Sequence, residues 1–287
     1  CVTFENTVVI KGINDSKKLT PKKRDLLYDE IYDKAKEVSV GIVHEDKIDE
    51  INILQAAYLA MKIALGNMKI KPDLVLIDGP SSNIKHYNVK HIIGGDSKSQ
   101  SIAAASIIAK VTRDRMMEQY DLIYPDYKFA KHKGYGTKYH IDTIKTLKSS
   151  PIHRKSFKIV KSNLPSFNYI KNSYGFKELA KMIVASYYVK KEFKILNNAY
   201  NVDQNNSFDY IVNKKHNCYF IKVHANDITT NISLNDNLYS DNCKFIKTFI
   251  LEKDLETNFT FIVISVMFQK NKKPLIKPIY KKELNSD

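Results

Sequence analysis

Apolar and polar positions alternate between two periods over the first 160 residues. A Thr-Pro pair at 20–21 suits a helix start, since the hydroxyl caps and proline fits the first turn. Residues 21–38 then place apolar side chains at helical spacing, with charge on the other face. Residues 38–43 predict a short strand, and the helical spacing returns at 48–68 and 101–120. This alternation predicts an α/β region.

One strand differs from the rest because its apolar residues are consecutive. The apolar run LVLI at 74–77 is followed by Asp78 and is stopped by Gly79 and Pro80. An unbroken apolar run is typical of a strand buried on both faces. Ligands of open α/β sheets bind at the carboxyl ends of strands, where Asp78 is expected. An Asp in that place is also a common turn or capping residue.

A second region begins where the composition and the periodicity of the sequence change. Residues 161–175 are rich in Ser, Asn, Pro and Gly without periodicity, which predicts a linker. A helix is then expected at 176–191, followed by apolar runs such as YFIKV and FTFIVISVMF between Asn- and Asp-rich turns. The expected organisation is therefore a first domain at 1–162, a linker at 163–175 and a second, smaller α/β domain at 176–287.

The charge balance points to a polyanionic partner. The 287 residues carry a net charge of +15 with a pI near 9.4, as nucleic-acid-binding chains do. Abundant Lys, Asn, Ile and Tyr are also what AT-rich coding produces, so compositional drift is the alternative. No apolar run is long enough for a membrane span, so no membrane partner is expected. The three scattered cysteines form neither a disulfide framework nor a metal knuckle, which favours a cytoplasmic location.

The first residues read as part of a strand and a turn. Residues 1–10 lack an initiating Met and the flexible polar residues that most termini carry. We expect this stretch to be the second half of an element whose first half lies upstream.

Three groups of polar residues are candidates for chemistry. Asp78 is the first, and Asp114 in the third predicted helix is the second, although a helical Asp is more often a solvated surface residue. The third group, FAKHKGYGTKYH at 129–140, packs basic and aromatic side chains around two glycines. Basic groups suit phosphates, and an exposed aromatic such as Tyr135 suits a base or sugar. The alternative is a glycine turn with solvated lysines.

Lys17 and Lys18 form a smaller basic group directly before the first helix. Backbone amides at a helix start also attract anions, so this segment is a second candidate contact for phosphate.

Together these segments resemble bacterial ribonuclease HII in order and spacing. The matching motifs, over about residues 5–160, are GINDSKKLTPKKR, DKIDEINILQAAYLAMKIA, PDLVLIDG, GDSKSQSIAAASIIAKVTRDRMM, YPDYKFAKHKGYGTKYH and SPIHRKSF. The resemblance implies a ribonuclease H-like mixed sheet flanked by helices. It also implies an endonuclease that cuts RNA in RNA–DNA hybrids and at ribonucleotides embedded in duplex DNA. A monomer is expected.

The same resemblance implies roles for particular residues. Asp78 and Asp114 correspond to two catalytic carboxylates that bind Mg²⁺ or Mn²⁺, hard cations that prefer such oxygens. Tyr135 corresponds to the tyrosine that stacks near the sugar at the junction. Lys17, Lys18 and Lys133 would contact the nucleic acid.

The departures from the family pattern concern the active site. Nothing in the sequence matches the DEAGRG segment, which holds the family's other two carboxylates and reads the 2′-hydroxyl. We expect it upstream of residue 1, and we expect the polypeptide as printed not to cleave. The alternative is a catalytically dead nucleic-acid-binding protein. Asp126, Lys128 and Gly94 are smaller departures in loops.

The second region weakly resembles the YraN family, which has a restriction-endonuclease-like fold. Asp209 matches the first acidic position of that pattern, whereas Lys222 and His224 stand where it has Glu and Lys. A cation in place of a carboxylate repels a metal, so a degenerate, non-catalytic domain is expected. An active nuclease in this region is the remaining alternative.

Overall fold

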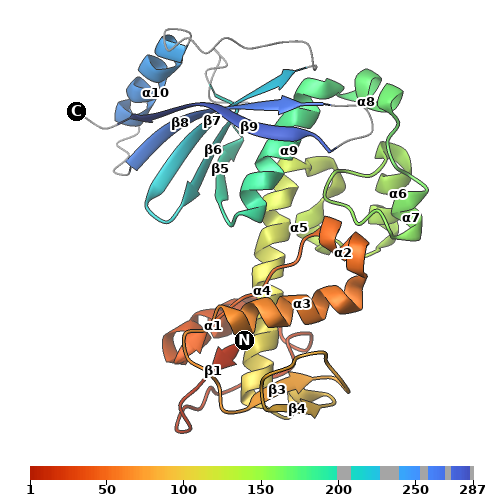
Figure 1. Cartoon of the computed structure of the whole chain (residues 1–287), viewed down its shortest axis with the longest axis vertical. Coiled ribbons are helices and arrows are strands. Elements are labelled where there is room, and N and C mark those ends of the chain that lie inside the picture. The colour runs from red at the N-terminus through yellow and green to blue at the C-terminus, as the bar shows by residue number, and fades with distance from the viewer. Residues whose placement is uncertain (199–207, 227–238, 253–257, 269–272, 285–287) are drawn as a thin grey trace. The chain divides into compact units, whose positions relative to one another are not determined.

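The computed structural model describes residues 1–198, 208–226, 239–252, 258–268 and 273–284 (Figure 1). The chain forms two compact units. The first comprises Cys1–Met116 with His153–Lys161, and the second comprises Met117–Ile152 with Ser162–Asp287. Both contain helices and sheet, which confirms the predicted α/β class with a second α/β region. No helix among the described residues is long and apolar enough to cross a membrane.

The first unit is built from short strands and longer helices. Its elements are β1 (Val2–Thr3), α1 (Pro21–Lys34), β2 (Glu37–Val38), α2 (Glu45–Ile51), α3 (Ile53–Gly66), β3 (Val75–Asp78), β4 (Val89–Ile92), η1 (Gly95–Ser97), the first part of α4 (Gln100–Ile123) and α7 (Lys158–Lys161). In the described residues its strands form two separate two-stranded sheets, β1 with β2 antiparallel and β3 with β4 parallel.

Helix α1 begins as predicted and ends earlier. Thr20 Oγ1 accepts a hydrogen bond from Lys23 N at 3.2 Å, and Leu27 and Ile31 are fully buried. They pack in one core with Ala104, Ile107, Ile108 and Val111 of α4. The prediction that the helix continues to residue 38 is wrong, because Glu37 and Val38 pair with β1.

The strand predicted at 38–43 is confirmed only at Val38. Beyond it the chain runs against α3, so close at Gly41 that a Cβ there would lie 1.9 Å from the carbonyl oxygen of Ala60. The backbone therefore packs on a helix at this point instead of pairing with a strand.

The helix predicted at 48–68 is two helices. Asn52 adopts φ 66°, which ends α2, and its side chain accepts hydrogen bonds from Leu54 N at 3.0 Å and Gln55 N at 3.1 Å. Asn is among the few residues that both tolerate this backbone and cap a helix.

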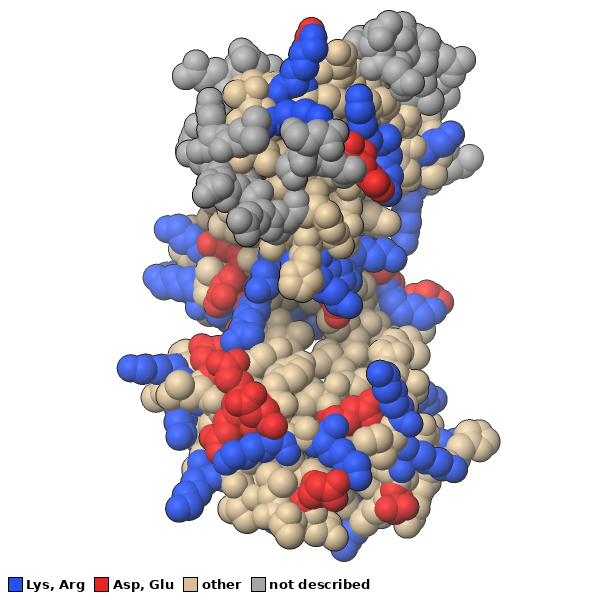
Figure 2. Space-filling view, turned by 90° about the vertical axis from the view of Figure 1, so that its left-hand side faces the viewer, with Lys and Arg blue, Asp and Glu red and all other residues tan. Residues whose placement is uncertain are grey.

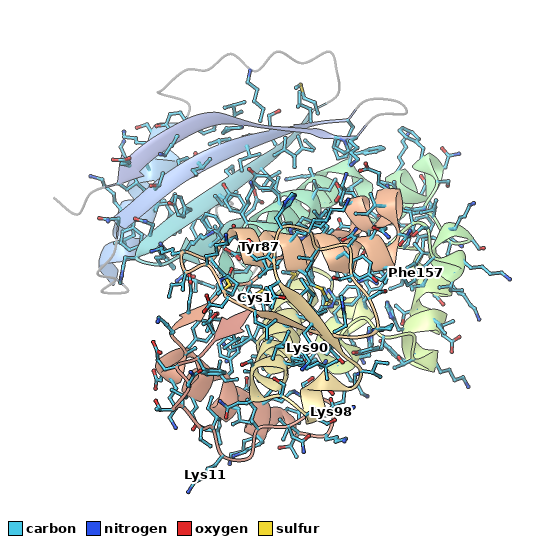
Figure 3. The ribbon with its side chains drawn as sticks, turned by 60° about the horizontal axis from the view of Figure 1, so that its bottom comes forward. Cys1, Lys11, Tyr87, Lys90, Lys98 and Phe157 are labelled. Carbon is cyan, nitrogen blue, oxygen red and sulfur yellow. The ribbon has the colours of Figure 1, made fainter. Side chains whose placement is uncertain are left out.

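Strand β3 is buried on one face, so the prediction of burial on both faces is wrong. Val75 and Ile77 pack with Leu65, and Cys1 and Tyr87 lie against this cluster (Figure 3). Leu74, before the strand, is 45% exposed. The reason is that the cluster with Leu65 covers the face that carries Val75 and Ile77, while Leu76 and Asp78 on the other face are half-buried and exposed.

The second unit continues α4 and adds a five-stranded sheet. Its other elements are η2 (Pro125–Tyr127), α5 (Phe129–His132), α6 (Lys138–Leu147), α8 (Phe167–Ser173), α9 (Gly175–Lys190), β5 (Lys194–Asn198), β6 (Tyr210–Lys214), β7 (Asn217–Asn226), α10 (Ser240–Glu252), β8 (Asn258–Met267) and β9 (Leu275–Leu284). The segment interpreted as a linker contains α8, capped by Ser166. The Asn- and Asp-rich turns expected between the apolar runs lie partly outside the described residues.

The sheet has the order β5-β6-β7-β8-β9, antiparallel except for the parallel pair β7–β8. Alternate residues of β7 point to opposite faces. Phe220 packs with Ile246 and Ile250 of α10, whereas Ile221 and Val223 are buried outside that cluster. Figure 1 shows α9 on the face opposite α10.

Candidate functional site

Asp78 is the last residue of β3 and is exposed to solvent. Its Oδ1 accepts a hydrogen bond from the backbone N of Gly95 at 2.9 Å. A Cβ on residue 95 would lie 2.5 Å from Ile102 Cδ1, so glycine allows this close approach. Gly79, directly after the aspartate, has φ 115°, which turns the chain away. Asp78 is thus held at the carboxyl end of the strand, as predicted.

Asp114 lies on α4 and both of its carboxylate oxygens face cations. Lys110 Nζ is 2.6 Å from Oδ1, and Arg24 Nη2 is 3.8 Å from Oδ2. The Asp114 side chain is 14% exposed. Neither partner was singled out from the sequence. Lys110 could have been found from its i,i+4 spacing to Asp114, but Arg24 is far away along the chain.

Arg24 also holds the loop that carries Lys17 and Lys18. Its Nη1 donates to the carbonyl oxygen of Ser16 at 2.9 Å and to that of Leu19 at 2.6 Å. Both lysines are exposed, while Ser16 between the loop and α4 is buried. The Ser16 and Ser106 hydroxyls are 2.9 Å apart. The lysine side chains therefore face solvent from a loop that is fixed to the helices beneath it.

The chain leading into this loop is tied to α4 by Gln100. Its Oε1 accepts from Ile10 N at 2.8 Å, and its Nε2 donates to Val8 O at 3.0 Å. One side chain thus satisfies two backbone groups, as a neighbouring strand would do. Lys11, which follows, extends away from the ribbon in Figure 3.

The glycine loop between α5 and α6 belongs to the second unit. Lys133 adopts φ 52°, and its Nζ lies 2.5 Å from Glu118 Oε1 of α4. Tyr135 is 63% exposed. The exposed tyrosine fits a contact to a sugar or base, whereas Lys133 is 19% exposed and engaged by an acid.

The buried histidines beside this loop contact protein groups. His132 and His140 are 7% and 5% exposed, and their rings stack with centroids 4.2 Å apart. His132 Nε2 contacts Tyr127 O at 2.7 Å, and His140 Nδ1 contacts Tyr135 O at 2.9 Å. Burial lowers the pKa of His140; the backbone contact to Tyr135 acts against this and the His132 charge adds to it.

The predicted site residues fall into two sets. Asp78, Asp114, Lys17 and Lys18 lie in the first unit, and Lys133 and Tyr135 lie in the second. Carboxylate oxygens suit Mg²⁺ or Mn²⁺, but within the described ranges no group of three or more His, Cys, Asp or Glu could hold a metal ion. Two cations also face Asp114. The described residues alone therefore do not fit a complete metal centre.

The acidic residue of the second region is also paired. Asp209 is 6% exposed, and its Oδ1 lies 3.2 Å from Lys181 Nζ, while its Oδ2 accepts from Val223 N at 2.7 Å. Glu178 contacts the same ammonium at 3.1 Å. His224 Nε2 lies 3.4 Å from the Tyr239 hydroxyl, and its pKa is lowered by burial and then by the Lys222 charge.

Basic side chains are spread over one face of the molecule. On the face shown in Figure 2, Lys and Arg are interrupted by Asp and Glu and do not form one continuous patch. The positive net charge therefore does not by itself mark where a polyanion binds.

Comparisons with known proteins cover the first part of the chain. A family model described as Ribonuclease HII matches residues 3–160. The ribonuclease HII of Clostridioides difficile (strain 630) is 51% identical over 156 residues, which are 54% of this chain and 61% of that protein. The ribonuclease HII of Acetivibrio thermocellus is 54% identical over 156 residues, again 54% of this chain and 61% of that protein. The chain thus spans about three fifths of the length of these relatives.

Proposed function

The chain belongs to the ribonuclease HII family, and from this premise we propose that it supplies part of a metal-dependent endoribonuclease. The substrates proposed are RNA in RNA–DNA hybrids and ribonucleotides embedded in duplex DNA, in replication and repair. The observation that carries the proposal is Asp78, an exposed carboxylate fixed at the carboxyl end of β3 by Gly95 N. Asp114 and the exposed Lys17 and Lys18 occur in the same unit.

Each of these residues has a proposed role. Asp78 and Asp114 are the carboxylates proposed for a divalent cation, Mg²⁺ or Mn²⁺, in a set completed by further carboxylates. Lys17 and Lys18 are proposed to bind backbone phosphates, which is supported by their exposure on a loop held by Arg24. Tyr135 is proposed to stack on a sugar or base, and Lys133 to lie beside the backbone.

The proposal distinguishes binding from cleavage. Residues 1–287 contain no match to the segment with the family's other two carboxylates, so this polypeptide alone is proposed to bind substrate without cutting it. Two carboxylates, one of them facing Lys110 and Arg24, leave too few ligands for a metal-dependent hydrolysis.

A gel assay tests this proposal. A labelled duplex with one ribonucleotide is incubated with Mn²⁺ and either the chain or a fusion that carries a strand with the family's DEAGRG segment at its N-terminus. We expect binding by both proteins and cutting by the fusion, which Asp78→Asn should abolish. Cutting that Asp78→Asn leaves unchanged would contradict the site.

A second candidate function is binding without catalysis. It is favoured by the two cations on Asp114, which occupy the carboxylate that the enzyme needs for metal. A fusion that binds the duplex tightly but does not cut it with either metal would support this alternative.

For the second region we propose a non-catalytic domain. The proposed boundaries are 1–162, 163–175 and 176–287, with a degenerate YraN-like domain at the end. The Lys181 ammonium beside Asp209 supports the loss of a metal site. A monomer in the cytoplasm is also proposed. Metal-dependent cleavage by the whole chain that requires Asp209, tested with Asp209→Asn, would contradict the non-catalytic assignment.

A further inference from the structure

The backbone of Tyr135 is fixed on both sides although its ring is exposed. Its N donates to the carbonyl oxygen of His132 at 2.9 Å, and its own carbonyl oxygen accepts from Thr137 N and from His140 Nδ1, each at 2.9 Å. The side chain remains 63% exposed. Because its backbone is already fixed, the exposed ring would lose less conformational entropy when it stacks on a ligand.

Two buried imidazoles supply part of this fixation. His132 stands before the glycine turn and His140 lies in the first turn of α6, so the pair spans the loop from both ends. Their rings are stacked at 4.2 Å with an interplanar angle of 18°. Phe129 packs its ring edge-on against both, at 5.8 Å and 5.6 Å. The loop therefore rests on a buried aromatic cluster.

The hydrogen bonds assign the tautomer of His132. Its Nδ1 accepts from Gly134 N at 3.2 Å, so that nitrogen carries no proton. Its Nε2 lies 2.7 Å from the Tyr127 carbonyl oxygen, which can only accept, so Nε2 donates. A second proton on His132 would place two donors face to face at Gly134.

The hydrogen bonds of His140 constrain its protons as well, and its ring is in contact with that of His132. Its Nδ1 donates to Tyr135 O, since that oxygen can only accept. Burial favours the uncharged form of His140 and lowers its pKa, and a positive charge on His132 would lower it further. Charged side chains on the surrounding elements are Asp126, Lys128, Lys131, Lys133 with its partner Glu118, Lys138, Asp142 and Asp121. None of these is among the groups that shift the pKa of His140, whereas His132 is.

We propose that His132 and His140 are positioning residues which, as a neutral stacked pair, hold the backbone of Tyr135 so that its ring is presented to nucleic acid. This inference rests on the proposed function, because it takes Tyr135 as a contact to substrate. The pair does not touch the ligand. It sets the orientation from which the tyrosine stacks, and protonation of the buried His140 imidazole at low pH releases the loop.

Binding of the full chain to a fluorescein-labelled RNA–DNA hybrid tests the inference, with the dissociation constant read from fluorescence polarisation. Tyr135→Ala is expected to weaken binding about fivefold or more, the lower range for loss of one stacked base. His140→Leu should weaken it by a similar factor. His140→Asn, whose amide can still donate to Tyr135 O, should stay within about twofold of the unchanged chain.

A double variant separates positioning from an independent effect. Tyr135→Ala with His140→Leu should bind no more than about twofold more weakly than Tyr135→Ala alone, since both changes remove the same contact. Fully multiplicative losses would overturn the inference. So would His140→Leu binding like the unchanged chain while Tyr135→Ala is weakened.

Hydrogen exchange without nucleic acid gives an independent readout. The amides of Gly134 and Tyr135 should exchange faster in His140→Leu, and in the unchanged chain as the pH is lowered to about 5 after correction for intrinsic exchange. They should remain protected in Tyr135→Ala. Protection that is unchanged in both cases would overturn the inference even where binding cannot be measured. A chain that shows the expected exchange but binds no hybrid would instead contradict the proposed function.

The pH profile completes the test. Hybrid affinity of the unchanged chain should fall between about pH 7.5 and 5, and the fall should be smaller in Tyr135→Ala. An equal fall in both proteins would overturn the link between the histidine pair and the tyrosine.

Discussion

The ammonium of Lys110, which lies one turn earlier on the same helix, is 2.6 Å from Oδ1 of Asp114. The pair is largely shielded, with side chains 21% and 14% exposed. A carboxylate held by an internal cation is available to a metal only when that cation moves. In this chain Lys110 and a divalent ion are therefore competitors for one side chain.

Removing this competitor should strengthen metal binding. Lys110→Met keeps the length of the side chain but loses its charge, so we expect the full chain to bind Mn²⁺ about tenfold more tightly. Isothermal titration calorimetry measures the change. Adding Asp114→Asn should cancel the gain, and a gain that persists without Asp114 would show that the metal binds elsewhere.

Arg24 is expected to matter for stability as well as for position. Arg24→Ala leaves the carbonyl oxygens of Ser16 and Leu19 without this donor, so the free energy of unfolding should fall by about 2 kcal/mol. Urea denaturation followed by circular dichroism gives the value. Lys34→Ala, at an exposed pair with Glu30, is the matched control and should change little. Equal effects of the two substitutions would contradict a special role for Arg24.

The lysine loop should dominate the electrostatics of binding. Replacing Lys17 and Lys18 together by Ala is expected to weaken hybrid binding about tenfold, and to reduce the slope of log affinity against log salt by about 2. Lys244→Ala is the control, because this side chain is 78% exposed on α10. The assignment fails if Lys244→Ala reduces the salt slope as much as the double substitution.

Stability should depend on pH through His140. Burial lowers the pKa of its imidazole below the usual 6.5, so the unfolded chain takes up the proton more readily than the folded one. The stabilisation is complete above pH 6.5 and is lost as the pH falls through the lowered pKa. Unfolding free energies measured from pH 7.5 to 5 should therefore fall less steeply in His140→Asn. Identical slopes in the two proteins would show that other groups cause the dependence.

The buried pair of Lys181 and Asp209 gives a test in the second unit. Lys181→Met leaves the carboxylate buried without its ammonium, and the loss should be about 3 kcal/mol. Combining it with Asp209→Asn removes the unpaired charge while the amide oxygen still accepts from Val223 N, so much of the loss should be recovered. Denaturation of the unchanged chain and of the two variants decides the point. A double variant less stable than Lys181→Met would refute the explanation.

The sequence allowed the local parts of this fold to be predicted. The start of α1 follows from Thr20 and Pro21, and the place of Asp78 follows from the apolar run before it. The break at Asn52 was missed because helical periodicity continues across it. The signal was present, however, since Asn both ends and begins helices.

Contacts between distant segments could not be predicted in this way. Nothing in the spacing of Arg24 indicates that it reaches Asp114, and nothing near Asp78 indicates that Gly95 supplies its donor. The burial of β3 on one face also depends on which segments pack against that face, and periodicity does not specify those segments. The sequence indicated the chemistry that a residue can perform, but not the residues that it contacts in the fold.

Gly41 provides an experimental control of a kind that the charged residues cannot. Any side chain there meets the backbone of α3, at 1.9 Å from Ala60 O and 2.8 Å from Ala64 N. Helix backbone cannot give way as a flexible side chain would. Gly41→Ala is therefore expected to disrupt this part of the chain while it alters no ionisable group. Binding to a polyanion that survives the substitution arises from charge alone, and binding that disappears requires the fold.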